Sequence, residues 1–348
     1  NWKANCPFHG EKTPSFMVNP ELQIFKCFGC GVGGDVYSFL EKMEGMTFGE
    51  VLKTLGDRVG VKLVSYKPSR QEEHRERLLR INKLVAETYH YLLVEHKIGE
   101  PALEYLLGRG VTSESIKKWK LGYAPDDWNF LTEFMVQKKG FAVSDLVELG
   151  LLVAGKNYDR FRNRIMFPLN NARGEVAGFA GRVLPDSTTQ KSNDPKIQPA
   201  KYINTPETEL YHKSELLYGF DITRSEIKRL GFAIVVEGEL DAISTYQVGI
   251  KNVAAIKGSA LTEKQVEMLR RVTDRVVLAL DADMAGNAAA RRGIEMAERA
   301  GLYVETVDWE KAAGVKDAAD LAVGDPEKLR SLVEKPISIY TFLIDTAI

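Results

Sequence analysis

Residues 235–241 read VVEGELD and residues 278–283 read LALDAD, and in both strings carboxylates directly follow a short apolar run. Such runs predict buried strands, and ligands of open α/β sheets gather beyond the carboxyl ends of the strands. Asp281 and Asp283 are two residues apart, so in an extended segment their side chains point to the same side. Glu237, Asp281 and Asp283 therefore form a candidate site for Mg²⁺ or Mn²⁺, which prefer oxygen ligands. For each residue alone, the alternative is an N-cap of the following helix.

The surrounding residues 231–321 alternate apolar runs with amphipathic stretches. The apolar runs predict strands at residues 232–236, 253–256, 276–280 and 302–307. The stretches between them have helical spacing at residues 240–248, 262–271 and 285–300. This alternation predicts a parallel, Rossmann-like sheet covered by helices.

The three cysteines of the chain and one histidine form two close pairs near its start. Cys6 and His9 lie in CPFH, and Cys27 and Cys30 lie in CFGC. Two such pairs, separated by the length of a β-hairpin, can hold one tetrahedral Zn²⁺, and a closed Cys₃His set is structural rather than catalytic. Because no cysteine is left over, chance clustering of buried cysteines is the weaker explanation.

Aromatic and basic residues surround these cysteines: Phe8, Phe16, Phe25, Phe28, Lys3, Lys12 and Lys26. Such residues on a small sheet could stack bases and hold phosphates. For any single Phe, a place in the core of a small domain is the favoured alternative.

Changes in composition along the chain divide it into segments. We predict a multidomain α/β (α+β) protein with a zinc-binding domain at 1–64, a linker at 65–76, a mixed α/β basic subdomain at 77–230, the parallel-sheet domain at 231–321 and a C-terminal helical segment at 322–348. Within the basic subdomain, helical patterns precede short strands.

Positive charge exceeds negative charge in residues 159–229. Arg160, Arg162 and Arg164 alternate, so we expect them to share one face of a strand and to match phosphate oxygens. Taken alone, a run of charge usually marks a solvated face, so this pattern is a weak signal for binding.

The overall composition excludes little. The net charge is −1 and the pI about 6.6, which argues neither for nor against nucleic acid. No apolar run approaches the ~20 residues of a membrane span, and no signal peptide pattern is present. Cysteines arranged for a metal predict a reducing, cytoplasmic location. The first residue is Asn, which suggests a piece of a longer protein.

Longer strings resemble a known family. Residues 159–169 (DRFRNRIMFPL), 178–184 (GFAGRVL), 200–208 (AKYINTPET) and 210–220 (LYHKSELLYGF) resemble successive motifs of the bacterial DnaG-type DNA primase core. The segment 231–321 resembles the Toprim fold of primases, topoisomerases and related nucleases. The CPFH/CFGC pairs and the Toprim motifs stand in that family's order, so the resemblance covers nearly the whole chain.

The resemblance to Toprim proteins implies roles for particular acids. Glu237, Asp281 and Asp283 match the family's metal-binding residues, and Asp241 matches a position that is commonly acidic in primases. The third acidic element of the family corresponds to residues 316–321, KDAADL. Here Asp317 fits as a Mg²⁺ ligand, but the usual second Asp is replaced by Ala319 and Asp320 comes one residue later, so the role of Asp320 stays open.

The resemblance to primases also implies roles for basic residues. Lys201 and Lys213 would line the active-site groove, and Arg162, Arg164 and Arg182, with Asp241, would contact template or nucleotide. For Tyr202 and Asn204 a structural role is the alternative.

The expected activity is the synthesis of short RNA primers on single-stranded DNA from ribonucleoside triphosphates, by metal-assisted nucleotidyl transfer with Mg²⁺ or Mn²⁺ and with a structural Zn²⁺. The family further implies a replicative helicase as a partner, bound through a C-terminal domain outside these residues.

Three rival hypotheses remain. A Toprim nuclease or topoisomerase would use the same acids to cleave DNA, and tyrosines for a topoisomerase are plentiful. A non-enzymatic zinc-ribbon protein would need a decayed Toprim site, against which the complete acid set argues. A phage-type primase–helicase fusion would carry a Walker motif, which these residues lack.

Overall fold

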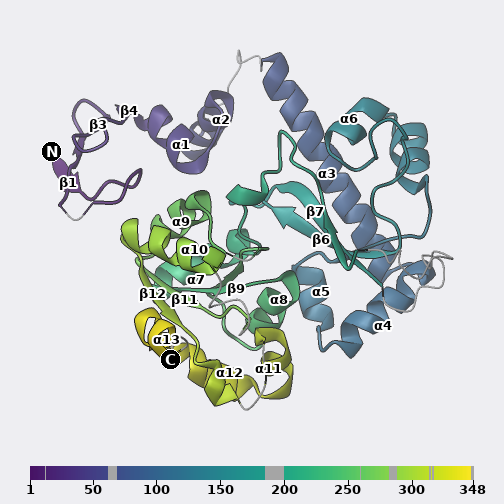
Figure 1. The fold of residues 1–348 in the computed structure, drawn as a ribbon. Helices are drawn as coiled ribbons and strands as arrows, with labels where there is room; N and C mark the ends of the chain where they lie inside the picture. Colours follow the sequence, from purple (N-terminus) through teal and green to yellow (C-terminus); the bar gives the residue numbers. More distant parts are fainter. Residues whose placement is uncertain are drawn as a thin grey trace.

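The computed structural model describes residues 1–11, 13–61, 69–184, 200–258, 260–281, 288–312, 315 and 317–345. These residues form three β-sheets with helices around them (Figure 1). Two sheets are antiparallel, and the third is the mainly parallel sheet predicted for residues 231–321. The predicted fold class is confirmed, and the predicted domain boundaries stay predictions.

The N-terminal part, here called the zinc module, is a four-stranded sheet followed by two helices. Its elements are β1 (Trp2–Ala4), β2 (Phe16–Asn19), β3 (Ile24–Cys27), β4 (Gly33–Asp35), α1 (Val36–Glu44) and α2 (Phe48–Val59). The rings of Phe8, Phe16, Phe25 and Phe39 pack with centroid separations of 5.3–6.1 Å and form the core of the module. Phe28, in contrast, is 74% exposed.

The basic subdomain begins with the long helix α3 (Arg70–Val94). Ser69 and Glu72 form a capping box that starts this helix at Arg70, so residues 70–76 of the predicted linker are helical. Residues 62–68 lie outside the described residues. The Asn82 Nδ2 of α3 donates to the carbonyls of Val176 and Ala177, which ties the helix to the sheet.

That sheet has the antiparallel order β5-β6-β7-β8. Its strands are β5 (Gly122–Ala124), β6 (Arg164–Asn170), β7 (Val176–Val183) and β8 (Tyr202–Asn204). The helices around it are η1 (Lys97–Gly99), α4 (Glu100–Gly108), α5 (Ser113–Lys118), the π-helix η2 (Thr132–Lys138), α6 (Val143–Glu148) and η4 (Lys213–Glu215).

The third sheet has the order β10-β9-β11-β12-β13. Its strands are β9 (Ala233–Val236), β10 (Val253–Ala255), β11 (Arg275–Leu278), β12 (Tyr303–Thr306) and β13 (Ile337–Ser338). The first four are parallel, as predicted, whereas β13 pairs antiparallel with β12. The prediction of a wholly helical C-terminal segment is therefore wrong at β13, whose two residues are too few to give a strand pattern.

Helices cover both faces of this parallel sheet, as Figure 1 shows. One face packs on α7 (Phe220–Leu230), α9 (Glu263–Arg270) and α10 (Ala288–Arg299), and the other on α8 (Glu239–Gln247), α11 (Ala318–Gly324) and α12 (Pro326–Glu334). The 3₁₀ helix η5 (Trp309–Ala312) and α13 (Ile339–Asp345) complete the domain. Along β9, Ala233 and Val235 belong to one core and Ile234 and Val236 to the other, which explains the uninterrupted apolar run.

The basic subdomain and the parallel-sheet domain share one hydrophobic core. Phe167 and Phe179 of the first belong to the same buried cluster as Ile234 and Val236 of the second. At the junction, the Trp119 ring of the first packs edge-on against Tyr246 of the second, with centroids 5.6 Å apart. This shared core fixes the position of β8 relative to the carboxyl ends of β9 and β11.

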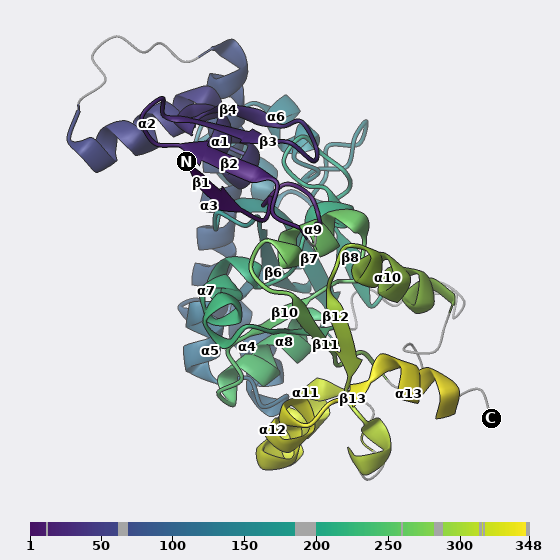
Figure 2. The same cartoon turned by 90° about the vertical axis from the view of Figure 1, so that its left-hand side faces the viewer.

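The zinc module lies at the top of the molecule in Figure 2 and makes polar contacts with the rest of it. Glu50 of α2 pairs with Arg173 at 2.9 Å, and Glu44 of α1 pairs with Arg224 at 3.5 Å. Among the described residues, no helix is both long and apolar enough to cross a membrane.

One buried acid of the basic subdomain gives a pH-dependent prediction. Asp159 is 1% exposed, and burial raises its pKa to about 7 from 3.8. Because folding raises this pKa, the folded protein holds the proton more tightly than the unfolded chain, and stability falls as the pH rises from about 4 to 7.

Asp159→Asn should remove this loss of stability with rising pH, because an amide side chain carries no charge that would have to be buried. Urea unfolding at pH 5 and pH 8 should show the parental free energy of unfolding declining more than that of the variant, by on the order of 2–4 kcal/mol. An equal decline in both proteins would contradict the assignment.

Candidate active site and zinc centre

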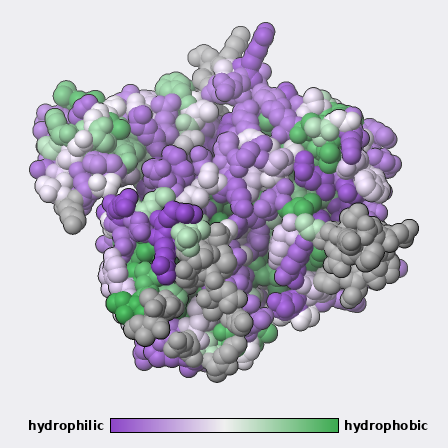
Figure 3. Space-filling view, in the orientation of Figure 1, coloured by the Kyte–Doolittle hydropathy of each residue, from purple (hydrophilic) through white to green (hydrophobic). Residues whose placement is uncertain are grey.

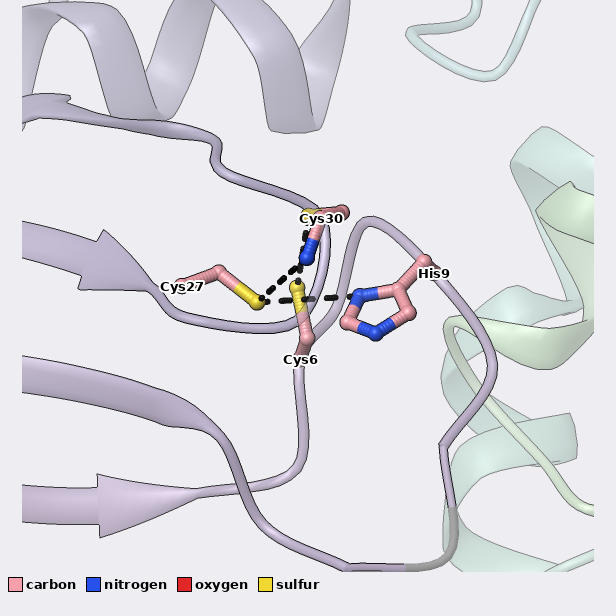
Figure 4. Close-up of side chains that lie close together, drawn as sticks. All are labelled: Cys6, His9, Cys27 and Cys30. Carbon is pink, nitrogen blue, oxygen red and sulfur yellow. Dashed lines mark hydrogen bonds between the residues drawn. The ribbon is translucent and has the colours of Figure 1, made fainter.

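The four predicted zinc ligands meet at the end of the zinc-module sheet, as Figure 4 shows. Their ligand atoms all lie within 4.8 Å of one another: Cys6, His9, Cys27 and Cys30. The Sγ atoms of Cys6 and Cys30 are 3.9 Å apart, and the Cys27 Sγ lies 3.7 Å from His9 Nδ1. A tetrahedron with Zn–S bonds of about 2.3 Å has sulfur–sulfur edges of roughly 3.8 Å. The donor set and its geometry therefore fit zinc.

Glu11, which the sequence analysis missed, links the ligand-bearing turns. Its Oε1 accepts the N–H groups of Cys6 at 2.7 Å and Ser15 at 2.9 Å, and its Oε2 lies 3.3 Å from His9 Nε2. Since His9 Nδ1 faces the cysteines, the Nε2–H can donate to Glu11, which fixes the tautomer that binds metal. An acid two residues after the histidine was the available signal.

Glu11→Gln should weaken zinc binding: with its oxygen on the Cys6 and Ser15 N–H groups, the amide presents its NH₂ to His9 Nε2, and an NH₂ group cannot accept that hydrogen bond. We expect a zinc dissociation constant about 10–100-fold higher, measured by competition with a chromogenic chelator. The matched control is Glu21→Gln, an exposed acid of the β2–β3 turn. Equal zinc affinity in all three proteins would contradict the role of Glu11.

The predicted acidic residues gather at the carboxyl edge of the parallel sheet. Glu237 follows β9 and Asp281 follows β11, and these strands are neighbours in the sheet. Asp241 lies in the first turn of α8, and Asp317 is the N-cap of α11. Asp283 lies outside the described residues.

Two of these acids, Glu237 and Asp241, have pKa values that are raised by burial and by neighbouring carboxylates. Burial, together with the charges of Asp317 and Asp281, raises the pKa of Asp241 to about 7. Burial also raises the pKa of Glu237, and the charge of Asp281 and a hydrogen bond to it act in the same direction. Asp241 therefore lies within electrostatic range of Glu237, Asp281 and Asp317, and Glu237 lies next to Asp281.

This edge fits a hard divalent cation. Among the described residues, the buried Glu237 Oε2 has no hydrogen-bond partner. A carboxylate oxygen without a donor, beside other carboxylates, loses hydration and gains repulsion. A cation bound between the acids would reverse both effects, which is the chemistry expected of Mg²⁺ or Mn²⁺.

Asp320 does not join the cluster. Its side chain is exposed and pairs with Arg109 at 3.3 Å. The sequence shift that separates Asp320 from the usual family position thus coincides with a different contact.

The predicted basic residues have three kinds of environment. Lys201 and Lys213 are exposed. Arg162 lies over the Trp128 ring, 3.9 Å from its centroid. Arg164 is 5% exposed and donates to the carbonyls of Gly181 and Ala200, and Arg182 donates to the hydroxyls of Tyr105 and Tyr202, both at 2.6 Å.

The expectation that Arg160, Arg162 and Arg164 share one face of a strand is wrong. Only Arg164 lies in β6, and Asn163, just before that strand, has a φ of 50°. This left-handed residue breaks the extended alternation, and Arg160 Nε bonds the Gly150 carbonyl instead.

Tyr202 of β8 connects the basic subdomain to the acidic edge. Burial raises its pKa to about 12; Arg182 lowers the pKa, and the charges of Glu239 and Asp241 raise it. The β8 strand, which pairs with β7 through Asn204 and Ala180, therefore stands beside the carboxylates. A structural role for Tyr202 and Asn204 agrees with these contacts.

The chain matches three family models in order. The CHC2 zinc finger model matches residues 1–71, the model for the N-terminal domain of the DNA primase catalytic core matches residues 89–224, and the Toprim-like model matches residues 234–322. The chain is also similar to the crystal structure of the Aquifex aeolicus primase, zinc-binding and RNA polymerase domains, with 32% identity and a TM-score of 0.64 over 99% of this chain and 81% of that chain. This chain belongs to the bacterial DnaG-type primase family.

Two further members of the primase family illustrate the coverage. The DNA primase of Halalkalibacterium halodurans is 38% identical over 326 residues, which are 92% of this chain and 51% of that protein. The RNA polymerase domain of Mycobacterium tuberculosis DnaG, solved with a double-stranded DNA oligomer with a 6-nucleotide overhang, is 31% identical with a TM-score of 0.67, over 78% of this chain and 84% of that chain. The chain spans about half the length of the curated primases it matches.

Proposed function

We propose that this chain synthesises RNA primers on a single-stranded DNA template by nucleotidyl transfer from ribonucleoside triphosphates, as part of DNA replication. The observation that carries the proposal is the group of Glu237, Asp241, Asp281 and Asp317 beside strand β8 of the basic subdomain. Membership of the primase family supports the same reaction.

Glu237, Asp281, Asp283 and Asp317 are proposed to hold Mg²⁺ or Mn²⁺, with Asp241 beside them. When bound, the metal neutralises charge that develops on the phosphates and orients the reacting oxygens. The chain's own acids give the site its position: strand pairing sets Glu237 and Asp281, and the N-cap of α11 sets Asp317. The Gly238 N–H donates to Asp241 Oδ2 at 2.9 Å, which orients that carboxylate.

Lys201, Lys213, Arg162 and Arg182 are proposed to hold the phosphates of template and nucleotide. Lys201 directly precedes β8 and is exposed, as is Lys213 in η4. Arg164 contacts two backbone carbonyls in a buried position, so its proposed task is to hold β6 and residue 200 together.

The zinc module is proposed to contact the template. Trp2 is 73% exposed and Phe28 is 74% exposed, and such rings can stack on unpaired bases. Figure 3 shows hydrophobic patches on the zinc module, at the upper left, where the neighbouring surface is mostly hydrophilic. DNA in the structure of the Mycobacterium tuberculosis relative supports DNA as a ligand class. A helicase partner rests on the family resemblance alone, and a cytoplasmic location rests on the arrangement of the cysteines for a metal.

Asp281→Ala should abolish primer synthesis, because it removes a carboxylate that faces Glu237. On single-stranded DNA with ribonucleotides and Mg²⁺, we expect a loss on the order of 100-fold or more in RNA product. Asp320→Ala is the matched control and should retain activity within about twofold, since Asp320 pairs with Arg109 away from the cluster.

The same assay separates synthesis from cleavage. Cut template without new RNA in the parental protein would overturn the proposed function in favour of a Toprim nuclease. Parental activity in the Asp281→Ala variant would overturn only the metal assignment.

Lys201→Ala should weaken template binding in a salt-dependent way. The plot of log affinity for single-stranded DNA against log salt should become shallower by about one unit, because one fewer phosphate contact releases one fewer counterion. Lys138→Ala, an exposed lysine of η2, serves as the control. An unchanged slope for Lys201→Ala would remove Lys201 from the groove.

A further inference from the structure

Lys257 and Glu239 form an ion pair in the interior of the protein, next to the acidic edge. The Lys257 Nζ contacts Glu239 Oε1, and their side chains are 4% and 6% exposed. Glu239 is the first residue of α8, two positions after Glu237, and Lys257 follows β10. Neither residue was a candidate in the sequence analysis.

Lys257 holds the Glu237–Gly238 turn from two sides. Its backbone N–H donates to the Glu237 carbonyl at 3.0 Å, while its side chain binds Glu239 on the other side of Gly238. Its φ of 55° lies in the left-handed region, which residues other than glycine adopt only when their surroundings enforce it. In this conformation one residue reaches both flanks of the turn.

Lys257 is the residue that neutralises the negative charge of Glu239. The charge of Glu239 raises the already burial-raised pKa values of Tyr202, Tyr211 and Tyr218, so this carboxylate faces three phenols of the basic subdomain. Among the described residues, Lys257 is the one cation within salt-bridge distance of Glu239.

We propose that Lys257 is a positioning residue of the metal site: by pairing with Glu239 it excludes this additional acid from the ligand set and fixes Glu237 against Asp281. The inference rests on the proposed metal-dependent function and extends it to residues that touch neither metal nor substrate. It assigns the two acids of EGE opposite tasks, Glu237 as a ligand and Glu239 as an anchor.

A purely structural role predicts a different behaviour. Replacing a buried ion pair by apolar residues of similar volume is often neutral or stabilising. If the pair served folding alone, Lys257→Met with Glu239→Leu would restore both stability and metal binding. If the pair positions Glu237, the double variant keeps its stability but loses metal affinity, because apolar contact lacks the directional hold on the turn.

The test measures Mn²⁺ binding to the zinc-loaded protein by electron paramagnetic resonance of free Mn²⁺, together with urea unfolding. We expect the double variant Lys257→Met/Glu239→Leu to unfold at a urea concentration near the parental one and to bind Mn²⁺ about tenfold more weakly. The single variant Lys257→Met should lose stability as well, because Glu239 is left buried and unpaired.

The matched control is Arg275→Met/Glu305→Leu. This partly buried pair joins β11 to β12 in the same sheet, and Arg275 lies at the start of β11, away from the carboxyl edge. It should bind Mn²⁺ as the parent does.

Mn²⁺ affinity at the parental level in the Lys257→Met/Glu239→Leu protein would overturn the positioning role. If the parent binds Mn²⁺ but makes no RNA, the proposed function fails while the Mn²⁺ comparison still decides the role of Lys257.

Discussion

The crowding of carboxylates at one sheet edge is the constraint on which the rest of the structure depends. Parallel pairing of β9 with β11 forces the residues after both strands to the same side, so Glu237 and Asp281 meet whether or not a cation is bound. Like charges at such separations resist ionisation, and burial adds to the cost. The hydrophobic cores on both faces of β9 hold this strand in place despite the unfavourable crowding of the carboxylates at its end.

The second requirement is a basic surface held at a fixed distance from this edge. The shared core between the two larger parts meets it with apolar contacts, of which the ring pair Trp119 and Tyr246 is an example. Tyr202 shows the result, since its hydroxyl bonds Arg182 while its ring lies in the field of Glu239 and Asp241. Apolar packing thus sets the distance between the acidic edge and the basic subdomain, and the polar side chains are positioned by that packing.

Patterns that repeat along the chain were predictable, and contacts between distant segments were not. The apolar runs ending at residues 236 and 280 gave the parallel strands because burial on both faces leaves a continuous signal. The CxxH and CxxC pairs gave the zinc ligands because a metal fixes their spacing. The antiparallel β13 was missed because an edge strand of two residues has no period to detect.

Side-chain roles were less predictable for the same reason. The alternating arginines do not reveal that Asn163 adopts a left-handed conformation, which breaks the strand before Arg164. Likewise, the burial of Arg164 depends on Gly181 and Ala200, which are distant in the sequence. Lys257 pairs with Glu239, 18 residues earlier in the chain, so its charge alone could not single it out; Glu11 had a local signal, because it follows His9 by two residues. The sequence therefore identifies candidate charged residues, but the role of each depends on the residue that it contacts in the fold.

The two kinds of interface in this protein differ in how firmly they hold. The zinc module meets the body through Glu50 with Arg173, Glu44 with Arg224, and the Met43 carbonyl with Arg271 at 3.0 Å. Ion pairs that remain partly exposed contribute little to stability and weaken as salt is added. A shared apolar core contributes more to stability and is not screened by salt. The acidic edge and β8 are joined through the shared apolar core, which fixes their separation. In the proposed function the zinc module contacts the template, and its ion pairs leave its position adjustable for that contact.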